Sequence, residues 1–259
     1  MEVLLLKKKV TREALETLYH RYNDEKYIQY DPIKYVYRFE DPVEQELVAL
    51  IVSSLAFGRV TQIFRAIDRI LEIADDRPLR YISLLNNEPD RDLLSFQYRF
   101  VTGGDMYHLF KVAGSIIRIY GSLGGFMQQY YRPGQFLRLV EEVTKVFQGV
   151  HYLVPCSLKG SACKRLFMLF RWMVRKDNID LGSWDFISPA ELVIPLDTHI
   201  FQAATALELT SRRTPSLAAA LEITEGLAEY SRHDPVKYDW ALSHQGILAN
   251  NFPAAHALS

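Results

Sequence analysis

Apolar residues recur at helical spacing along most of the chain, with polar residues between them. In residues 61–74, Ile63, Ile67 and Ile70 fall on one side of a helix, and residues 43–56 are apolar enough to form a buried one. The same spacing predicts helices over residues 11–22, 43–56, 61–74, 105–120, 135–147, 217–230 and 235–248. We therefore predict an all-α protein.

Residues 27–39 depart from this helical spacing. Tyr35, Tyr37 and Phe39 alternate with other residues in the step of a β-strand. This alternation predicts an extended arm that is held loosely by the helices. No internal repeat or low-complexity linker interrupts the chain.

A carboxylate is expected at the point where a loop gives way to a helix near residue 197. Pro195 disfavours a helical conformation at Ile194, and Asp197 is one of the preferred residue types for capping a helix N-terminus. Backbone N–H groups and the positive end of the helix dipole both stabilise a carboxylate anion at such a position. Asp197 is therefore either a structural cap or an anion that stabilises a developing positive charge.

A lysine is expected in the first turn of an earlier helix. Gly160 and Ser161 have the residue types of a turn and a cap, and the apolar face of the helix behind them begins at Cys163. This places Lys164 near a helix N-terminus, where a cation is electrostatically disfavoured. The position suits a phosphate clamp or a nucleophilic amine, and the alternative is a solvated surface lysine.

The order of these motifs resembles that of the helix-hairpin-helix base-excision DNA glycosylases. Gly160 matches the hairpin glycine of that superfamily, Lys164 its Schiff-base lysine, and Asp197, in Leu-Asp-Thr-His-Ile, its catalytic aspartate. The chain is also similar to an uncharacterised bacterial domain family of unknown function. The resemblance implies one globular unit, residues 1–259, with two helical lobes: about 1–45 with 195–259, and about 46–194. Lys164 and Asp197 are then expected to face each other across a cleft.

The resemblance also implies a function. The chain is expected to be an enzyme, a DNA glycosylase with or without a β-lyase step, that removes a damaged base from double-stranded DNA. Lys164 and Asp197 are the expected catalytic residues, and His199 is a further candidate. The expected DNA-binding residues lie around the hairpin: Lys159, Gly160, Ser161 and Arg165.

Two departures from the superfamily pattern limit this resemblance. Ala162 stands where the second hairpin glycine would fall, which weakens close approach to a phosphate. The chain has only two cysteines, Cys156 and Cys163, so it cannot build the four-cysteine iron–sulfur site of some members. We expect no cofactor, and no metal site is predicted, because these cysteines and His151 lack a fourth partner at zinc spacing.

The net charge of the chain does not decide whether it binds nucleic acid. The formal net charge is −1, whereas binding to the DNA backbone depends on Lys and Arg. Basic residues do gather near the hairpin, although Arg171, Arg175 and Lys176 are equally well explained as the solvated face of a helix. The alternative function is therefore a non-catalytic nucleic-acid-binding module, and a helical protein-interaction module ranks third.

The remaining expectations come from composition. With 49% hydrophobic and 24% charged residues, the chain is typical of globular proteins. No apolar run approaches the roughly 20 residues that span a bilayer, so no membrane association is expected. The apolar residues precede Lys7, Lys8 and Lys9, which reverses the order of a secretory signal, so the predicted location is the cytoplasm. We expect a monomer.

Overall fold

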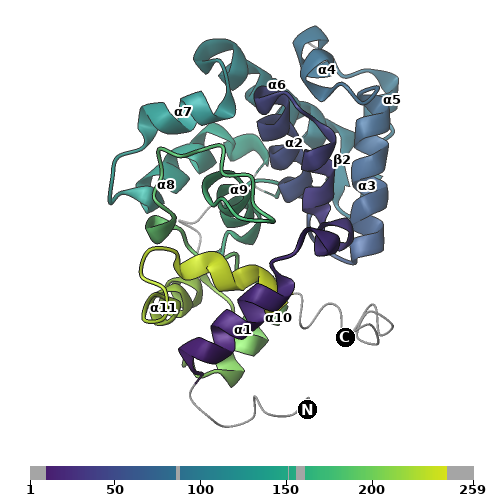
Figure 1. Cartoon of the computed structure of the whole chain (residues 1–259). Coiled ribbons are helices and arrows are strands. Elements are labelled where there is room, and N and C mark those ends of the chain that lie inside the picture. Colours follow the sequence, from purple (N-terminus) through teal and green to yellow (C-terminus); the bar gives the residue numbers. More distant parts are fainter. Residues whose placement is uncertain (1–9, 86–87, 151, 156–160, 244–259) are drawn as a thin grey trace. The chain divides into compact units, whose positions relative to one another are not determined.

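The computed structural model describes residues 10–85, 88–150, 152–155 and 161–243 (Figure 1). These residues are mostly helical, and the sheet among them has two short strands, so the predicted all-α class is confirmed. The chain divides into two compact units. Unit 1 comprises Met1–Tyr27, Gly160–Gly182 and Ser188–Ser259, and unit 2 comprises Ile28–Lys159 and Ser183–Ile187.

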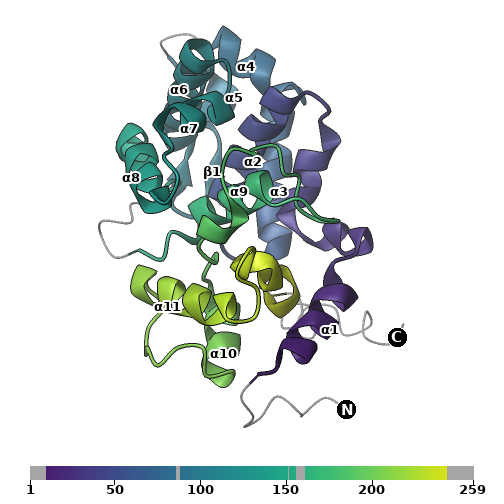
Figure 2. The ribbon, with the colours of Figure 1, turned by 60° about the vertical axis from the view of Figure 1, so that its left-hand side comes forward.

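Unit 1 collects helices from both ends of the sequence and from its middle. Its elements are α1 (Arg12–Tyr22), α9 (Lys164–Val174), η5 (Pro189–Glu191), α10 (Thr198–Ala206), α11 (Leu217–Ala228) and η6 (Pro235–Tyr238), followed by helical residues 239–243. η6 contacts both α11 and α1. Figures 1 and 2 both draw the yellow segment that contains η6 beside the purple α1. The N-terminal and C-terminal helices therefore belong to one core.

Unit 2 is built around α2 and α6. Its elements are η2 (Pro32–Arg38), α2 (Pro42–Leu55), α3 (Val60–Ile73), α4 (Pro78–Leu84), α5 (Arg91–Leu94), β1 (Gln97–Tyr98), β2 (Val101–Thr102), α6 (Gly103–Tyr120), α7 (Leu123–Tyr130), α8 (Phe136–Val146) and η3 (Gln148–Val150). α2 contacts η2, α3, α4 and α7, and α6 contacts α4, α5 and α7. β1 and β2 pair in antiparallel fashion as a hairpin.

The division differs from the predicted lobes. Residues 28–45 belong to unit 2 and residues 161–182 to unit 1, whereas the resemblance placed them the other way round. The packing explains both changes, because η2 packs against α2, and α9 is joined to the C-terminal segment by ion pairs from Arg171 and Arg175.

The long predicted helices are confirmed where the structure describes them, and their caps follow the expected chemistry. Thr11, the predicted cap of the first helix, accepts a hydrogen bond from the Ala14 N–H at 3.2 Å. Of the last predicted helix, residues 235–238 form a 3₁₀ turn, residues 239–243 are α-helical, and the rest lies outside the described residues.

The predicted extended arm over residues 27–39 is wrong. The segment forms the 3₁₀ helices η1 (Glu25–Tyr30) and η2, and Asp31 caps η2 by accepting from the Ile33 N–H at 2.9 Å. Pro32, Ile33, Tyr35 and Val36 are buried, whereas Tyr37 is 45% exposed. Burial therefore does not follow the alternation of Tyr35, Tyr37 and Phe39 on which the strand prediction was based.

The buried helix α2 carries one charged side chain into the core of unit 2. Every residue from Glu46 to Leu55 is buried, which confirms the sequence expectation for this helix. The carboxylate of Glu46 accepts hydrogen bonds from Trp184 Nε1 and from the backbone N–H of Gly124, both at 2.8 Å. Gly124 has to be glycine here, because a Cβ would lie 2.6 Å from Glu46 Oε1 and 2.6 Å from Trp184 Nε1.

We therefore expect Gly124→Ala to lower the free energy of unfolding by about 2–3 kcal/mol, since the methyl group must displace a hydrogen-bonded carboxylate. Gly104→Ala is the matched control, because its Cβ would meet no atom closer than Thr102 Oγ1 at 3.5 Å. That variant should be neutral or more stable by up to about 1 kcal/mol. Urea unfolding followed by circular dichroism measures both, and equal stabilities would contradict the close-packing account.

Candidate functional site

Lys164 is the first residue of α9, as the sequence predicted, but the turn before it differs from the expected one. The N-cap is Cys163, whose backbone is left-handed at φ 48°, and its side chain makes no capping bond. Ser161 is not the cap of α9; its Oγ accepts a hydrogen bond from the Cys163 N–H at 3.2 Å. Gly160 and Lys159, predicted to bind DNA, lie outside the described residues.

Asp197 is the N-cap of α10, which confirms the sequence prediction. Its Oδ1 accepts a hydrogen bond from the Ile200 N–H at 2.9 Å, and its backbone oxygen accepts from the Phe201 N–H at 2.8 Å. Pro195 and Leu196 in the preceding loop are buried. The carboxylate is therefore fixed through one oxygen, and its other oxygen is left for a second partner.

That second partner is Lys164. The Lys164 Nζ lies 3.5 Å from Asp197 Oδ2, and the two side chains are 32% and 21% exposed. The sequence analysis expected them to serve one site, and this distance brings them together. Both residues belong to unit 1, so the expectation that they face each other across a cleft between two lobes is wrong. A partly exposed amine beside a fixed carboxylate can exchange a proton with it and remain within reach of a ligand.

The same face of α9 continues into the interior of unit 1. Arg171 and Arg175 follow Lys164 by seven and eleven residues, or about two and three helical turns, so the three cations lie along one line. Arg171 is 4% exposed and Arg175 is 2% exposed. The interpretation of these arginines as a solvated face is therefore wrong, although Lys176 is exposed as that interpretation requires.

Aspartates surround the two buried arginines. Arg171 bonds to Asp180 at 3.2 Å and to Asp239, and Arg175 bonds to Asp180, to Asp177 at 2.8 Å and to Asp234 at 2.9 Å. Four carboxylates thus face two guanidinium groups. We call these six residues the buried ion cluster.

The surroundings of the cluster shift the pKa of its carboxylates in opposite directions. Burial raises the pKa of Asp180 to about 6, although the charges of Arg171 and Arg175 lower it. For Asp177, burial acts to raise the pKa, but the charge of Arg175 and backbone hydrogen bonds lower it below the ordinary value. The cluster therefore holds carboxylates that differ in how readily they take up a proton.

Asp239 connects the cluster to the Lys164–Asp197 pair. It is 3% exposed, and burial raises its pKa against the opposing charge of Arg171. The charge of Asp197 raises this pKa further and the charge of Lys164 lowers it, so Asp239 lies within electrostatic reach of both. Sequence reasoning missed this residue. Asp239 lies inside the helix predicted over residues 235–248, where the local sequence does not distinguish it from a solvated residue.

Two other predicted site residues lie close by. Arg165 follows Lys164 and is half-buried, and burial lowers its pKa to about 10, which leaves it protonated at neutral pH. His199 is half-buried in the first turn of α10. DNA contact by Arg165 and a chemical role for His199 stay predictions.

Within the described ranges, no group of three or more His, Cys, Asp or Glu residues is placed to hold a metal ion. Cys163 is a buried thiol whose Sγ donates a hydrogen bond to the backbone oxygen of Ser161 at 3.4 Å. Within the same residues no helix is long and apolar enough to cross a bilayer.

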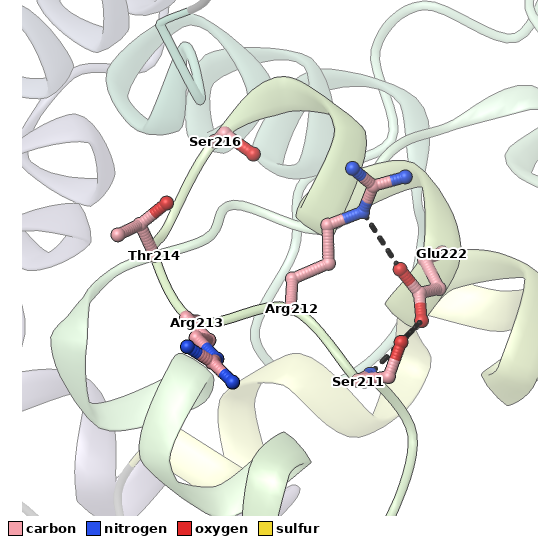
Figure 3. A pocket seen from close by; sticks show the side chains of 6 residues that line it. All are labelled: Ser211, Arg212, Arg213, Thr214, Ser216 and Glu222. Atoms are coloured by element: carbon pink, nitrogen blue, oxygen red, sulfur yellow. Dashed lines mark hydrogen bonds and ion pairs between the residues drawn. The ribbon is translucent and has the colours of Figure 1, made fainter.

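A second feature of unit 1 is an open hollow of about 400 Å³ before α11 (Figure 3). It is lined by Ser211, Arg212, Arg213, Thr214, Ser216 and Glu222. Arg212 Nε bonds to Glu222 Oε2 at 2.9 Å, and the Ser211 N–H bonds to Glu222 Oε1 at 3.0 Å. Figure 3 shows Arg212 turned toward Glu222 and Arg213 placed apart from it. Because Glu222 already neutralises Arg212 and would repel an anion, the hollow is a weaker candidate than the Lys164–Asp197 pair.

A family model described as "Protein of unknown function (DUF2400)" matches residues 31–248. The chain belongs to this family. The matched range includes both Lys164 and Asp197, and it also includes all six residues of the buried ion cluster. Neither a curated protein nor a solved structure matches the chain. The family description names no activity, so a functional argument has to start from the chemistry of the site.

The geometry of Asp197 separates its capping role from its charge. Asp197→Ala removes the acceptor of the Ile200 N–H and should lower the free energy of unfolding by about 1 kcal/mol. Asp197→Asn should lower it by only a few tenths of a kcal/mol, because asparagine caps a helix equally well. Ser216→Ala, which removes the cap of α11, sets the scale with an expected loss of about 1 kcal/mol. Thermal and urea unfolding measure all three, and an Asp197→Asn loss as large as that of Asp197→Ala would contradict the capping account.

Proposed function

We propose that the chain is a DNA glycosylase that excises a damaged base and continues with a Schiff-base lyase step. Lys164 is the nucleophile in this proposal, and Asp197 is its carboxylate partner. The observation that carries it is the 3.5 Å separation of Lys164 Nζ and Asp197 Oδ2 at a partly exposed position. The substrate class comes from the resemblance in the order of Gly160, Lys164 and Asp197 to the helix-hairpin-helix glycosylases.

The first step requires a neutral amine. Lys164 can pass its ammonium proton to Asp197, the acceptor 3.5 Å away. The amine nitrogen then forms a bond to C1′ of the deoxyribose, while the bond from C1′ to the base breaks and the base leaves with the electron pair and takes up a proton. The leaving base takes the proton held by Asp197, so the Asp197 carboxylate is restored and stabilises the positive charge that develops on the sugar.

The second step uses the amine already attached. Opening of the sugar ring and loss of the remaining nitrogen proton give an imine between Lys164 and C1′. Removal of a proton from C2′ then breaks the bond from C3′ to the phosphate oxygen, with no change in the total oxidation state. Water finally hydrolyses the imine and releases the lysine. Borohydride added before this hydrolysis reduces the imine to a stable amine that links protein and DNA.

We expect borohydride to trap the protein on a duplex that carries the correct lesion, and Lys164→Gln to abolish trapping, because an amide cannot form an imine. The panel has to span oxidised, alkylated and deaminated bases. Lys145→Gln is the matched control, since Lys145 is an exposed lysine in an ion pair with Glu142. Its trapping should equal that of the unchanged protein.

Asp197→Asn provides the second readout in the same assay. It keeps the cap but loses the anion, so base release should slow by roughly 10²-fold, the usual cost of removing one electrostatic stabiliser. A protein that neither traps nor releases any base in the panel faster than the Lys164→Gln, Asp197→Asn double variant would overturn the enzyme proposal.

The alternative, a non-catalytic nucleic-acid-binding module, is favoured by an exposed aromatic surface on unit 2. We define this surface by Phe57, Phe100 and Tyr152 together with Arg99. Phe57 and Phe100 are stacked at 5.1 Å between ring centroids, and Phe100 lies 5.6 Å from Tyr152. Phe100 and Tyr152 are 54% and 53% exposed, and the Arg99 guanidinium lies 5.9 Å from the Phe57 ring. Exposed rings beside an arginine suit stacking with unpaired bases.

The alternative function requires the aromatic surface to bind nucleic acid, which gives it a test of its own. Phe100→Ala should weaken binding to single-stranded or lesion-containing DNA by about 5- to 100-fold, the range for losing one stacked base. Ile119→Ala removes another exposed apolar side chain, from α6, and should bind as the unchanged protein does. Fluorescence anisotropy at low salt measures the affinities. Equal binding by the Phe100→Ala variant would contradict the alternative function.

A further inference from the structure

The segment that leads to Asp197 is buried although it has no regular structure. Residues 192–197 lie between η5 and α10, and neither a helix nor a strand includes them. Residues 192–196 are all buried, and Ile194 is 0% exposed. A backbone N–H group buried in such a segment costs free energy unless it finds an acceptor. The segment therefore needs an acceptor from another part of unit 1.

That acceptor is a threonine of α11. The Ile194 N–H donates a hydrogen bond to Thr224 Oγ1 at 3.0 Å. The Thr224 hydroxyl donates in turn to the backbone oxygen of Ala220, one helical turn earlier in α11, at 2.7 Å. The hydroxyl proton is thereby engaged, which leaves an oxygen lone pair for Ile194. Thr224 is therefore fixed as an acceptor, and it joins the buried segment to α11.

The connection from Ile194 to Asp197 is short and stiff. Pro195 fixes its own φ and restricts Ile194 to extended conformations, and Leu196 is 3% exposed. At its far end, Asp197 Oδ1 accepts the hydrogen bond from the Ile200 N–H at 2.9 Å. A displacement of Ile194 is therefore passed on to Asp197, because the residues between them have little freedom to absorb it.

The Lys164–Asp197 pair tolerates little displacement. The Lys164 Nζ lies 3.5 Å from Asp197 Oδ2. An ion pair extends to about 4 Å, so moving the carboxylate away by roughly 0.5 Å or more separates the two groups. The position of the buried segment thus decides whether the pair is formed.

We propose that Thr224 is a positioning residue for the Lys164–Asp197 pair. Its hydroxyl holds Ile194, and through the buried segment it sets the distance between the ammonium and the carboxylate. The role of Thr224 in a reaction rests on the proposed function, whereas the positioning itself does not. Thr224 acts through the backbone and takes no part in bond making.

The direct test observes Lys164 by NMR after reductive methylation with ¹³C-formaldehyde. Lys164→Gln assigns the signal, and Asp197→Asn gives its position without the carboxylate charge. Thr224→Val keeps the shape of the side chain but puts a methyl group where the acceptor was, which forces Ile194 away. The Lys164 signal should then move at least half of the way to its Asp197→Asn position. Thr224→Ser keeps the hydroxyl and should restore the signal of the unchanged protein.

Thr205→Val is the matched control. Thr205 lies in α10, the helix that Asp197 caps, and its hydroxyl donates to the Phe201 backbone oxygen at 2.8 Å. The same substitution there should leave the Lys164 signal unchanged. Thr224→Val with an unmoved signal would overturn the proposal, even if the variant were less stable, because Thr224 would then support the fold alone. An equal movement in Thr205→Val would also overturn it.

Thr224→Val leaves the Ile194 N–H without its acceptor, so the fold of every variant is checked by circular dichroism. Thr224→Cys is read in its place if Thr224→Val does not fold. Sulfur accepts a weaker hydrogen bond than a hydroxyl oxygen does, so the Lys164 signal should move in the same direction by a smaller amount. An unmoved signal in the folded Thr224→Cys protein would equally contradict the proposal.

A lesion that supports trapping allows a second readout. At saturating DNA, the trapping rate of Thr224→Val should fall by about 10- to 100-fold, since a misplacement of about 1 Å has a cost of this order. The Kd for DNA should stay unchanged, because no cation that contacts phosphate is removed. Thr224→Ser should recover most of the rate. A weaker Kd with an unchanged rate at saturation would contradict the positioning role.

The two readouts separate this proposal from the proposed function. Absence of trapping by the unchanged protein on every lesion would defeat the glycosylase proposal. The Lys164 signal in the Thr224 variants would still decide whether Thr224 positions the pair.

Discussion

Two buried arginines on one helix constrain the rest of unit 1. Removing a guanidinium from water costs several kcal/mol unless carboxylates and hydrogen bonds replace the lost solvation. Arg171 and Arg175 obtain this replacement from the turn after α9, through Asp177 and Asp180, and from the C-terminal segment, through Asp234 and Asp239. α9 is therefore tied to parts of the chain that lie far from it in the sequence.

This arrangement determines how the candidate site is built. Lys164 starts the helix that the buried ion cluster holds in place, and Asp197 is fixed by its cap at the start of α10. Each side chain thus approaches the other from a backbone position that is already fixed. The pair is partly exposed, whereas Arg171, Arg175, Asp180 and Asp239 of the cluster are buried, so a ligand can reach the pair but not these four residues.

The two units place their polar groups differently. Among its described residues, unit 2 buries one carboxylate, Glu46, which accepts hydrogen bonds from an indole N–H and a backbone N–H and is thereby satisfied within the protein. Its outward chemistry is the aromatic surface around Phe100. Unit 1 instead buries a network with more carboxylates than guanidinium groups and joins it to a lysine. Titratable chemistry therefore belongs to unit 1, and stacking chemistry belongs to unit 2.

The sequence by itself determined the local features. The helical class, the cap at Thr11, the cap at Asp197 and the position of Lys164 in a first turn were all predicted correctly, because each depends on residues within about four positions. The same local reasoning failed at Ser161 and over residues 27–39, where two patterns competed and the packing of Ile33 and Val36 decided between them.

Only the tertiary structure decided which charges are buried and which residues share a site. Arg171 meets Asp239 across 68 positions and Arg175 meets Asp234 across 59, and nothing in the neighbourhood of either arginine distinguishes it from a solvated one. The same holds for Asp239, whose burial beside Arg171 depends on segments that meet in unit 1. Periodicity and capping act over one helical turn, whereas the compensation of a buried charge depends on whatever the fold brings into contact with it.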